Sequence, residues 1–176
     1  GKDHTIFNVK RSEGSVYHAT GSIYGYGDNV TVKDLTIDGM TVDYTAAVDS
    51  SSNTYHAFGA LAGFVGNGFT AENVTVKNVT MNLNLLGEEG YAHASFHRLP
   101  AECIGGLVGY AKGSVTLTDC NVENLTVNVT DMNDSGGTQF LIGGLIGYAD
   151  ALYTQIPGEN EYSSSRDYVG NGSVTI

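Results

Sequence analysis

The chain has 176 residues, and its 19 acidic residues outnumber its 8 lysines and arginines, giving a formal charge of −11. Such an acidic surface repels nucleic-acid phosphates and anionic membranes, so we expect no nucleic-acid partner and no direct membrane insertion. The sequence has no apolar run long enough to span a bilayer, and its two cysteines are too few for a disulfide scaffold. The 24 glycines and two prolines favour a sheet-rich fold with many tight bends.

A glycine-rich hexapeptide recurs four times along the chain. It reads GSIYGY from Gly21, GALAGF from Gly59, GGLVGY from Gly105 and GGLIGY from Gly143, at intervals of 38, 46 and 38 residues. Self-similarity at a nearly fixed period is typical of a repeat architecture. We therefore predict a single repeat domain over residues 1–176, with repeats starting near 21, 59, 105 and 143, and expect it to be part of a longer protein.

A strand-like segment follows each hexapeptide. Its copies start at Val30, Phe69 and Val115, and the fourth copy is Val174-Thr175-Ile176. When the copies are aligned without gaps, alternate columns are apolar in every copy, as in the column Leu35/Val74/Cys120. A period of two residues predicts strands with one buried face.

The alternation slips at two places in each copy of this segment. The first slip falls at Asp34, Asn73 and Asp119, and the second falls at Gly39, Asn78 and Asn124. Asp, Asn and Gly tolerate the left-handed backbone conformation better than other residues. We therefore predict corners that turn the chain without reversing its direction.

These features together predict an all-β fold, a parallel β-helix or β-solenoid of repeated short strands whose equivalent residues stack at ~4.8 Å. From usual strand and loop lengths, we expect each 38-residue interval to hold two coils of about 19 residues. A single flattened coil per repeat is the alternative. The competing fold is an antiparallel meander or sandwich of short strands, because Asp38-Gly39 is a hairpin signal.

The two cysteines fall in columns of small or apolar residues. Cys120 shares its column with Leu35 and Val74, and Cys103 aligns with Ala57 and Leu141. Both are predicted to be buried free thiols that behave as hydrophobic side chains. A disulfide between them is the second possibility.

Two insertions interrupt the repeat, at about residues 84–104 and 149–168. Binding sites are usually located in such interruptions. The candidate ligand-binding residues are Tyr91, His93, His97, Arg98, Tyr153, Tyr162 and Arg166. His93 and His97 lack the following Glu of a zinc-peptidase motif, and the sequence has no nucleophile elbow or phosphate loop. We therefore predict no catalytic residue, no metal site and no cofactor.

The segments Gly106-Leu107-Val108-Gly109 and Gly144-Leu145-Ile146-Gly147 resemble the bacterial GLUG motif, in which U is a hydrophobic residue. The copy at residues 59–63 has Ala60 at the first position of the four, and the copy at residues 21–25 departs at two positions. The resemblance implies a bacterial surface-exposed or secreted protein, such as a large adhesin or the non-catalytic part of a secreted peptidase. It transfers no catalytic residue, because the motif carries none.

The resemblance leads us to expect a non-catalytic structural or adhesive module rather than an enzyme, located outside the cell or on its surface. The inserted loops would bind an unidentified extracellular protein or glycan, and the isolated chain would be monomeric. The alternative is a non-catalytic or carbohydrate-recognising part of a secreted polysaccharide-degrading enzyme or peptidase. Each hexapeptide ends in an aromatic residue, which predicts a stacked ladder in preference to a ligand platform. These residues are Tyr26, Phe64, Tyr110 and Tyr148.

Overall fold

The computed structural model describes eight ranges of the chain: residues 4–13, 19–47, 56–86, 102–131, 140–150, 152–155, 168–171 and 174–176. The secondary structure in these ranges is entirely β, and most of its strands form three sheets. Sheet A contains β1 (His4–Phe7), β2 (Lys10–Glu13), β5 (Thr31–Asp38), β6 (Thr41–Ala47), β9 (Phe69–Leu86), β12 (Val115–Thr118), β13 (Asn121–Asp131) and β18 (Val174–Thr175). Sheet B contains β3 (Ala19–Thr20), β7 (His56–Gly59), β10 (Glu102–Gly105) and β14 (Phe140–Gly143). Sheet C contains β4 (Tyr24–Gly27), β8 (Ala62–Val65), β11 (Val108–Lys112) and β15 (Ile146–Asp150).

Every strand pair within these three sheets is parallel. The predicted columns are the observed register: Leu35 lies opposite Val74 in sheet A, and Ala57 lies opposite Cys103 in sheet B. The parallel pairing is therefore confirmed, and an antiparallel meander of the repeats is wrong. Within the described ranges, the single antiparallel pair joins β16 (Leu152–Gln155), which lies in the second insertion, and β17 (Tyr168–Asn171), which starts at the last residue of that insertion.

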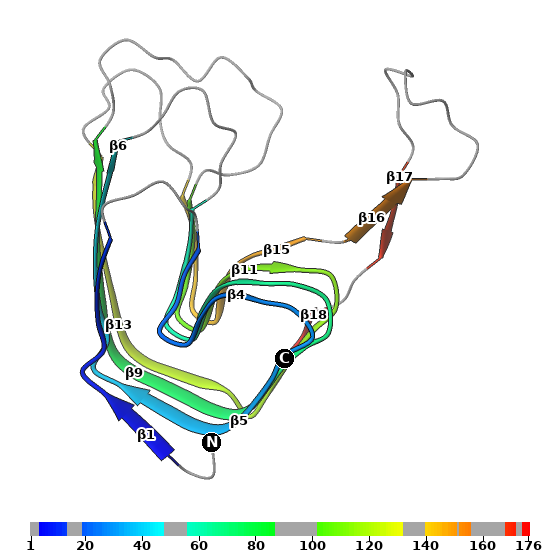
Figure 1. Cartoon of the computed structure of the whole chain (residues 1–176), viewed down its shortest axis with the longest axis horizontal. Coiled ribbons are helices and arrows are strands. Elements are labelled where there is room, and N and C mark those ends of the chain that lie inside the picture. The colour runs from blue at the N-terminus through cyan, green and yellow to red at the C-terminus, as the bar shows by residue number, and fades with distance from the viewer. Residues whose placement is uncertain are drawn as a thin grey trace.

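The chain visits the sheets in the order B, C, A in each repeat, and Figure 1 shows the successive passages following the same path. Residues paired in sheet B are one whole repeat apart, as Cys103 is from Leu141. Each repeat therefore passes once through sheets B, C and A. The expectation of two coils of about 19 residues per repeat is wrong. The physical reason is that the long strand segment fills only sheet A, while the hexapeptide and its flanks supply the strands of sheets B and C.

The predicted corners are confirmed by the backbone conformation. The first-slip residues Asp34, Asn73 and Asp119 have φ values of 52°, 53° and 52°. At the second slip, Gly39, Asn78 and Asn124 have φ values of 78°, 56° and 54°. Because these residues turn the chain without reversing its direction, β9 continues in one strand from Phe69 to Leu86 and still directs its apolar side chains to the core.

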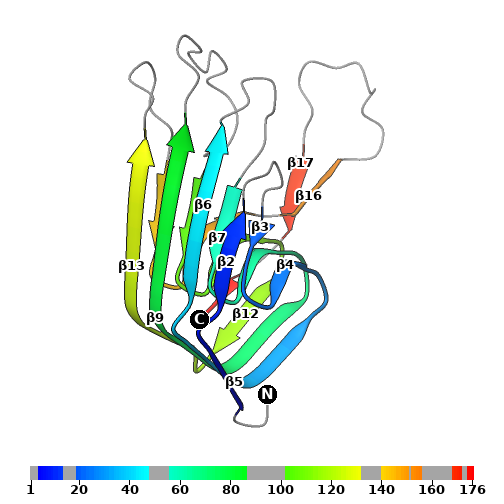
Figure 2. The ribbon, with the colours of Figure 1, turned by 60° about the vertical axis from the view of Figure 1, so that its left-hand side comes forward.

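The core lies on the inner face of sheet A, against sheets B and C. In the central strand β9, the side chains of Val76, Val79, Met81 and Leu83 have no exposed surface. The equivalent residues of β13 are half-buried and pack against the same core. They are Val122, Leu125, Val127 and Val129. The difference arises because, among the described strands, β13 pairs with β9 on one side only and lies at the edge of the row of strands seen in Figure 2.

Candidate functional surfaces

The hexapeptide forms the corner between sheets B and C. In its third copy, Gly105 ends β10, Gly106 and Leu107 make the bend, and Val108 begins β11. Corners of successive repeats are joined by backbone hydrogen bonds: the Leu61 N–H donates to the Leu107 carbonyl at 2.9 Å, and the Leu107 N–H donates to Leu145 at 3.0 Å. Leu107 and Val108 are both completely buried. The motif therefore stacks corners and fills the core.

The last glycine of the motif allows sheets B and C to approach each other closely. A Cβ atom on Gly109 would lie 2.5 Å from the backbone nitrogen of Phe58 and 2.7 Å from the carbonyl oxygen of Gly63. The next copy has the same arrangement, since a Cβ on Gly147 would lie 2.5 Å from the nitrogen of Ile104. Backbone fills this space, so any side chain at these positions would force the corner apart.

The aromatic residues that end the hexapeptides form the predicted ladder. The ring centroids of Tyr26 and Phe64 are 5.0 Å apart, those of Phe64 and Tyr110 are 4.8 Å apart, and those of Tyr110 and Tyr148 are 5.4 Å apart. The interplanar angles of 18–29° describe stacked rings. Tyr110 is only 3% exposed and packs with Ala57 and Cys103, whereas Tyr26 is 61% exposed. The middle of the ladder is therefore a second small core, and its first ring is open to solvent.

Two ladders of amide side chains cross sheet A. The Nδ2 of Asn78 donates to Oδ1 of Asp38 at 2.7 Å, and the Nδ2 of Asn124 donates to Oδ1 of Asn78 at 3.1 Å. The second ladder runs through Asp43, Asn82 and Asn128, with distances of 2.8 Å at both steps. In each ladder the donor belongs to the later repeat. These ladders were not predicted from the sequence, although the recurrence of Asn or Asp in outward columns was a signal for them.

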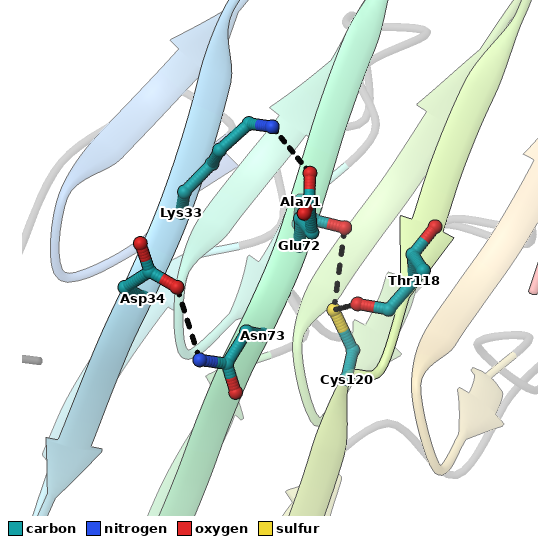
Figure 3. A network of polar contacts seen from close by, with 7 residues as sticks. All are labelled: Lys33, Asp34, Ala71, Glu72, Asn73, Thr118 and Cys120. Carbon is teal, nitrogen blue, oxygen red and sulfur yellow. Dashed lines mark hydrogen bonds and ion pairs between the residues drawn. The ribbon is translucent and has the colours of Figure 1, made fainter. Parts of the chain in front are cut away.

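Among the described residues, two ion pairs also join neighbouring repeats on the outer face of sheet A. Lys33 contacts Glu72, and the hydrogen bond and charge of that carboxylate raise the pKa of Lys33 (Figure 3). The Lys77 ammonium lies 3.3 Å from the carboxylate of Asp38. The hydrogen bond from Asn78 is the main reason that the pKa of Asp38 is lowered, and Lys77 adds to that effect. Exposed pairs such as these contribute little stability, so they mainly favour the correct register.

The two cysteines are free thiols with different environments. Cys103 is completely buried, as predicted. Cys120 is only half-buried, so its predicted burial is wrong: it lies between β12 and β13, and among the described strands β13 pairs with β9 on one side only. Its Sγ lies 3.5 Å from the Ala71 carbonyl oxygen and 3.4 Å from that of Thr118 (Figure 3). Partial burial raises the pKa of the Cys120 thiol.

Most candidate ligand-binding residues lie outside the described ranges. These are Tyr91, His93, His97, Arg98, Tyr162 and Arg166. Tyr153 lies in β16, where its backbone pairs with Gly170 in β17. The described structure therefore brings none of these seven residues together into a site.

Besides residues 14–18, which join β2 to β3, three connectors lead from sheet A to sheet B, and the described residues place their ends. These connectors are residues 48–55, 87–101 and 132–139. They follow the ends of β6, β9 and β13, where Thr45, Asn84 and Thr130 lie opposite one another. They lead into β7, β10 and β14, whose first residues His56, Glu102 and Phe140 are also in register. The strand residues before the three connectors are therefore in register with one another, and so are the strand residues after them. Neighbouring attachment points are one strand spacing apart.

Neither a metal-binding cluster nor a membrane-spanning helix is found in the described part of the chain. None of its residues form a group of three or more His, Cys, Asp or Glu side chains that could hold a metal ion. No helix there has the length and apolar character needed to cross a membrane.

Comparison with known proteins gives one match. A family model described as the GLUG motif matches residues 100–130, which include β10, β11 and β12 and most of β13. No curated protein and no solved structure matches the chain. The matched segment contains the corner Gly106–Gly109, whose glycine and leucine positions are explained above by close backbone approach and core packing. The chain therefore contains a GLUG motif within residues 100–130.

Proposed function

We propose that this chain is a non-catalytic module of a bacterial extracellular or cell-surface protein, built as a parallel β-solenoid that presents its inserted segments to an extracellular protein or glycan. The GLUG motif is found in extracellular and surface proteins, which supports this location. The corners, amide ladders and aromatic ladder hold successive repeats in one register, which supports a stiff scaffold.

The observation that carries the proposal is the alignment of the three connectors. Their anchoring residues are in register at both ends, so the three segments begin and end at the same edges of the stack, on strands that lie ~4.8 Å apart. A rigid scaffold with variable segments on one edge is a common design for binding surfaces. The longest connector, residues 87–101, contains Tyr91, His93, His97 and Arg98, which supply aromatic and basic groups on an otherwise acidic chain.

Replacing connectors tests the proposal. Residues 87–101 are exchanged for the shorter sequence of residues 132–139, which already joins the same two sheet edges in the third repeat. The chain and the variant are applied to a glycan array and to a panel of purified extracellular-matrix proteins. We expect the chain to bind at least one probe, and the exchange to weaken that binding at least ~10-fold while Tm stays unchanged. That fold-change equals ~1.4 kcal/mol.

The matched control exchanges residues 48–55 for the same sequence, which removes none of the candidate binding residues. This control should keep the binding of the unmodified chain. Binding that survives exchange of every connector would contradict the proposal. Hydrolysis of a glycan or peptide by the purified chain, abolished by one substitution, would instead support the enzymatic alternative.

A further inference from the structure

The outer face of sheet A carries a regular array of polar side chains beyond its second corner. We call this array the polar facet. It lies on the parts of β6, β9 and β13 that follow Gly39, Asn78 and Asn124, where Figure 2 shows the three strands side by side. Its outward residues form three rows in register across the strands: Thr41, Thr80 and Thr126; Asp43, Asn82 and Asn128; Thr45, Asn84 and Thr130.

The polar facet faces away from the core. In β9, the outward residues Thr80 and Asn82 are half-exposed, whereas Met81 and Leu83 between and beyond them have no exposed surface. Neighbouring members of a row are ~4.8 Å apart, and successive rows are two residues, or ~6.6 Å, apart. The facet therefore presents hydroxyl and amide groups as a two-dimensional lattice.

The polar facet is almost uncharged on a chain whose formal charge is −11. Among the nine residues of its three rows, Asp43 is the one charged side chain. Five charged outward side chains of the same sheet lie before the second corner instead: Lys33, Asp38, Glu72, Lys77 and Glu123. Interfaces match the electrostatic potentials of their partners, so a partner complementary to this facet is uncharged.

The middle row of the polar facet is held in place by its own hydrogen bonds. The Nδ2 of Asn82 donates to Oδ1 of Asp43, and the Nδ2 of Asn128 donates to Oδ1 of Asn82, both at 2.8 Å. An Asn amide has two N–H donors, and each of these bonds uses one of them. The threonines of the flanking rows are β-branched and have few rotamers. Binding through this facet therefore requires little further ordering of side chains.

The composition of the polar facet is unlike that of a protein interface. The centres of protein–protein interfaces are enriched in aromatic residues, Met and Arg, and none of these occurs in the three rows. Thr and Asn side chains instead donate and accept hydrogen bonds in the way that alcohol groups do. A surface rich in hydroxyl groups therefore matches the facet.

We propose that the polar facet binds the flat face of a crystalline, uncharged polysaccharide, a solid in which parallel sugar chains present hydroxyl groups at regular intervals. A single dissolved chain laid along one row would meet only three side chains, whereas a flat solid meets all three rows at once. Many weak contacts then act together. This surface is separate from the connectors of the proposed function, and it takes a different kind of ligand.

The test is depletion of the purified chain from solution by microcrystalline cellulose and by crystalline chitin. We expect the chain to bind at least one of these solids. Thr80→Arg places a long charged side chain at the middle of a row and should lower the partition coefficient at least ~10-fold, or ~1.4 kcal/mol. Thr130→Arg, at an exposed position of the same facet, should also lower it and is the less demanding change for folding.

The matched control is Thr75→Arg. Thr75 lies in the same strand as Thr80, is also half-exposed and faces outward, but it comes before the corner at Asn78. This variant should bind the solid as the unmodified chain does. Exchange of residues 87–101 for the sequence of residues 132–139 should also leave this binding unchanged, because the facet is not altered.

Four outcomes would overturn the proposal. They are no binding to either solid, equal loss in Thr75→Arg and Thr80→Arg, preferential binding to insoluble polygalacturonate, which is anionic, and shaping of ice crystals by the chain that Thr80→Arg abolishes. The last would show that ice is the occupant. Loss of binding on connector exchange but not in Thr80→Arg would also count against the facet, while it would support the proposed function of the connectors.

Discussion

The side chain of Asn124 donates a hydrogen bond from Nδ2 to Oδ1 of Asn78 at 3.1 Å, although the two residues are 46 positions apart in the chain. Both have the left-handed backbone conformation, with φ values of 54° and 56°. One residue type therefore provides both the corner and the contact between repeats. This coincidence makes the corner asparagines informative positions to change.

Asn78→Ala should destabilise the protein more than Asn78→Gly. Both variants remove two ladder hydrogen bonds, each contributing ~0.5–1.5 kcal/mol. Alanine adds the left-handed conformational cost of ~1–2 kcal/mol, which glycine avoids. Urea unfolding measures the difference, and equal losses for the two variants would show that φ at this corner is not constrained.

Gly109→Ala should strongly destabilise or unfold the chain, because its Cβ would lie 2.5 Å from the Phe58 nitrogen. Gly144→Ala is the matched control within the same motif, since an added Cβ there meets nothing within 4 Å. We expect the control to change the free energy of unfolding by under ~0.5 kcal/mol. Similar thermal stability of the two variants would contradict the close approach of sheets B and C.

Leu107→Ala should cost ~2–5 kcal/mol, the range for a leucine without exposed surface. Leu125→Ala should cost less, because Leu125 is half-buried on the edge strand β13. Chemical denaturation of both variants gives the comparison. A larger loss for Leu125→Ala would contradict the half-buried position of Leu125.

The lowered pKa of Asp38 predicts a specific pH dependence. A carboxylate whose folded pKa lies below its unfolded value stabilises the fold above the unfolded pKa, and this contribution is lost as pH falls through the folded pKa. Asp38→Asn should therefore reduce the fall in stability between neutral pH and about pH 3. Asp28→Asn, at an exposed corner, is the comparison. Identical Tm–pH curves for the chain and the Asp38→Asn variant would contradict the role of the Asn78 hydrogen bond.

The two thiols should react at different rates with a thiol reagent. Cys103 should react only when the chain unfolds, because it has no exposed surface. Cys120 should react in the native state, but more slowly than a free thiol, because partial burial raises its pKa. Mass spectrometry of the labelled protein after brief exposure identifies the modified residue. Labelling of Cys103 before Cys120 would contradict their assigned burial.

The parallel register could be predicted from the sequence because stacking couples whole columns. The column of Leu35, Val74 and Cys120 is apolar in every repeat because its members stack on the same core. Asn78 and Asn124 indicate a corner because few residues tolerate positive φ. The number of passages per repeat was harder to predict. A 38-residue interval is compatible with one passage or two, and only the pairing of Ala57 with Cys103 decides between them.

The candidate site could be predicted only in part. Recurring glycines and aromatics identified the corner and the ladder of Phe64 and Tyr110. The half-buried position of Cys120 was missed, because a column shows which face a residue occupies and not whether a further strand covers it. Residues in an insertion such as Tyr91 have no equivalents in other repeats, so no column predicts where they lie.

Disulfide trapping across repeats tests the parallel register most directly. In a background with Cys103→Ser and Cys120→Ser, paired cysteines replace outward residues that lie opposite each other, Thr75 with Asn121 or Thr80 with Thr126. Both pairs should cross-link rapidly in the folded chain, and Thr75→Cys with Thr126→Cys should not, because those positions lie five residues out of register. Cross-linking of Thr75→Cys with Thr126→Cys, and not of the two in-register pairs, would show antiparallel pairing and contradict the stacked parallel fold.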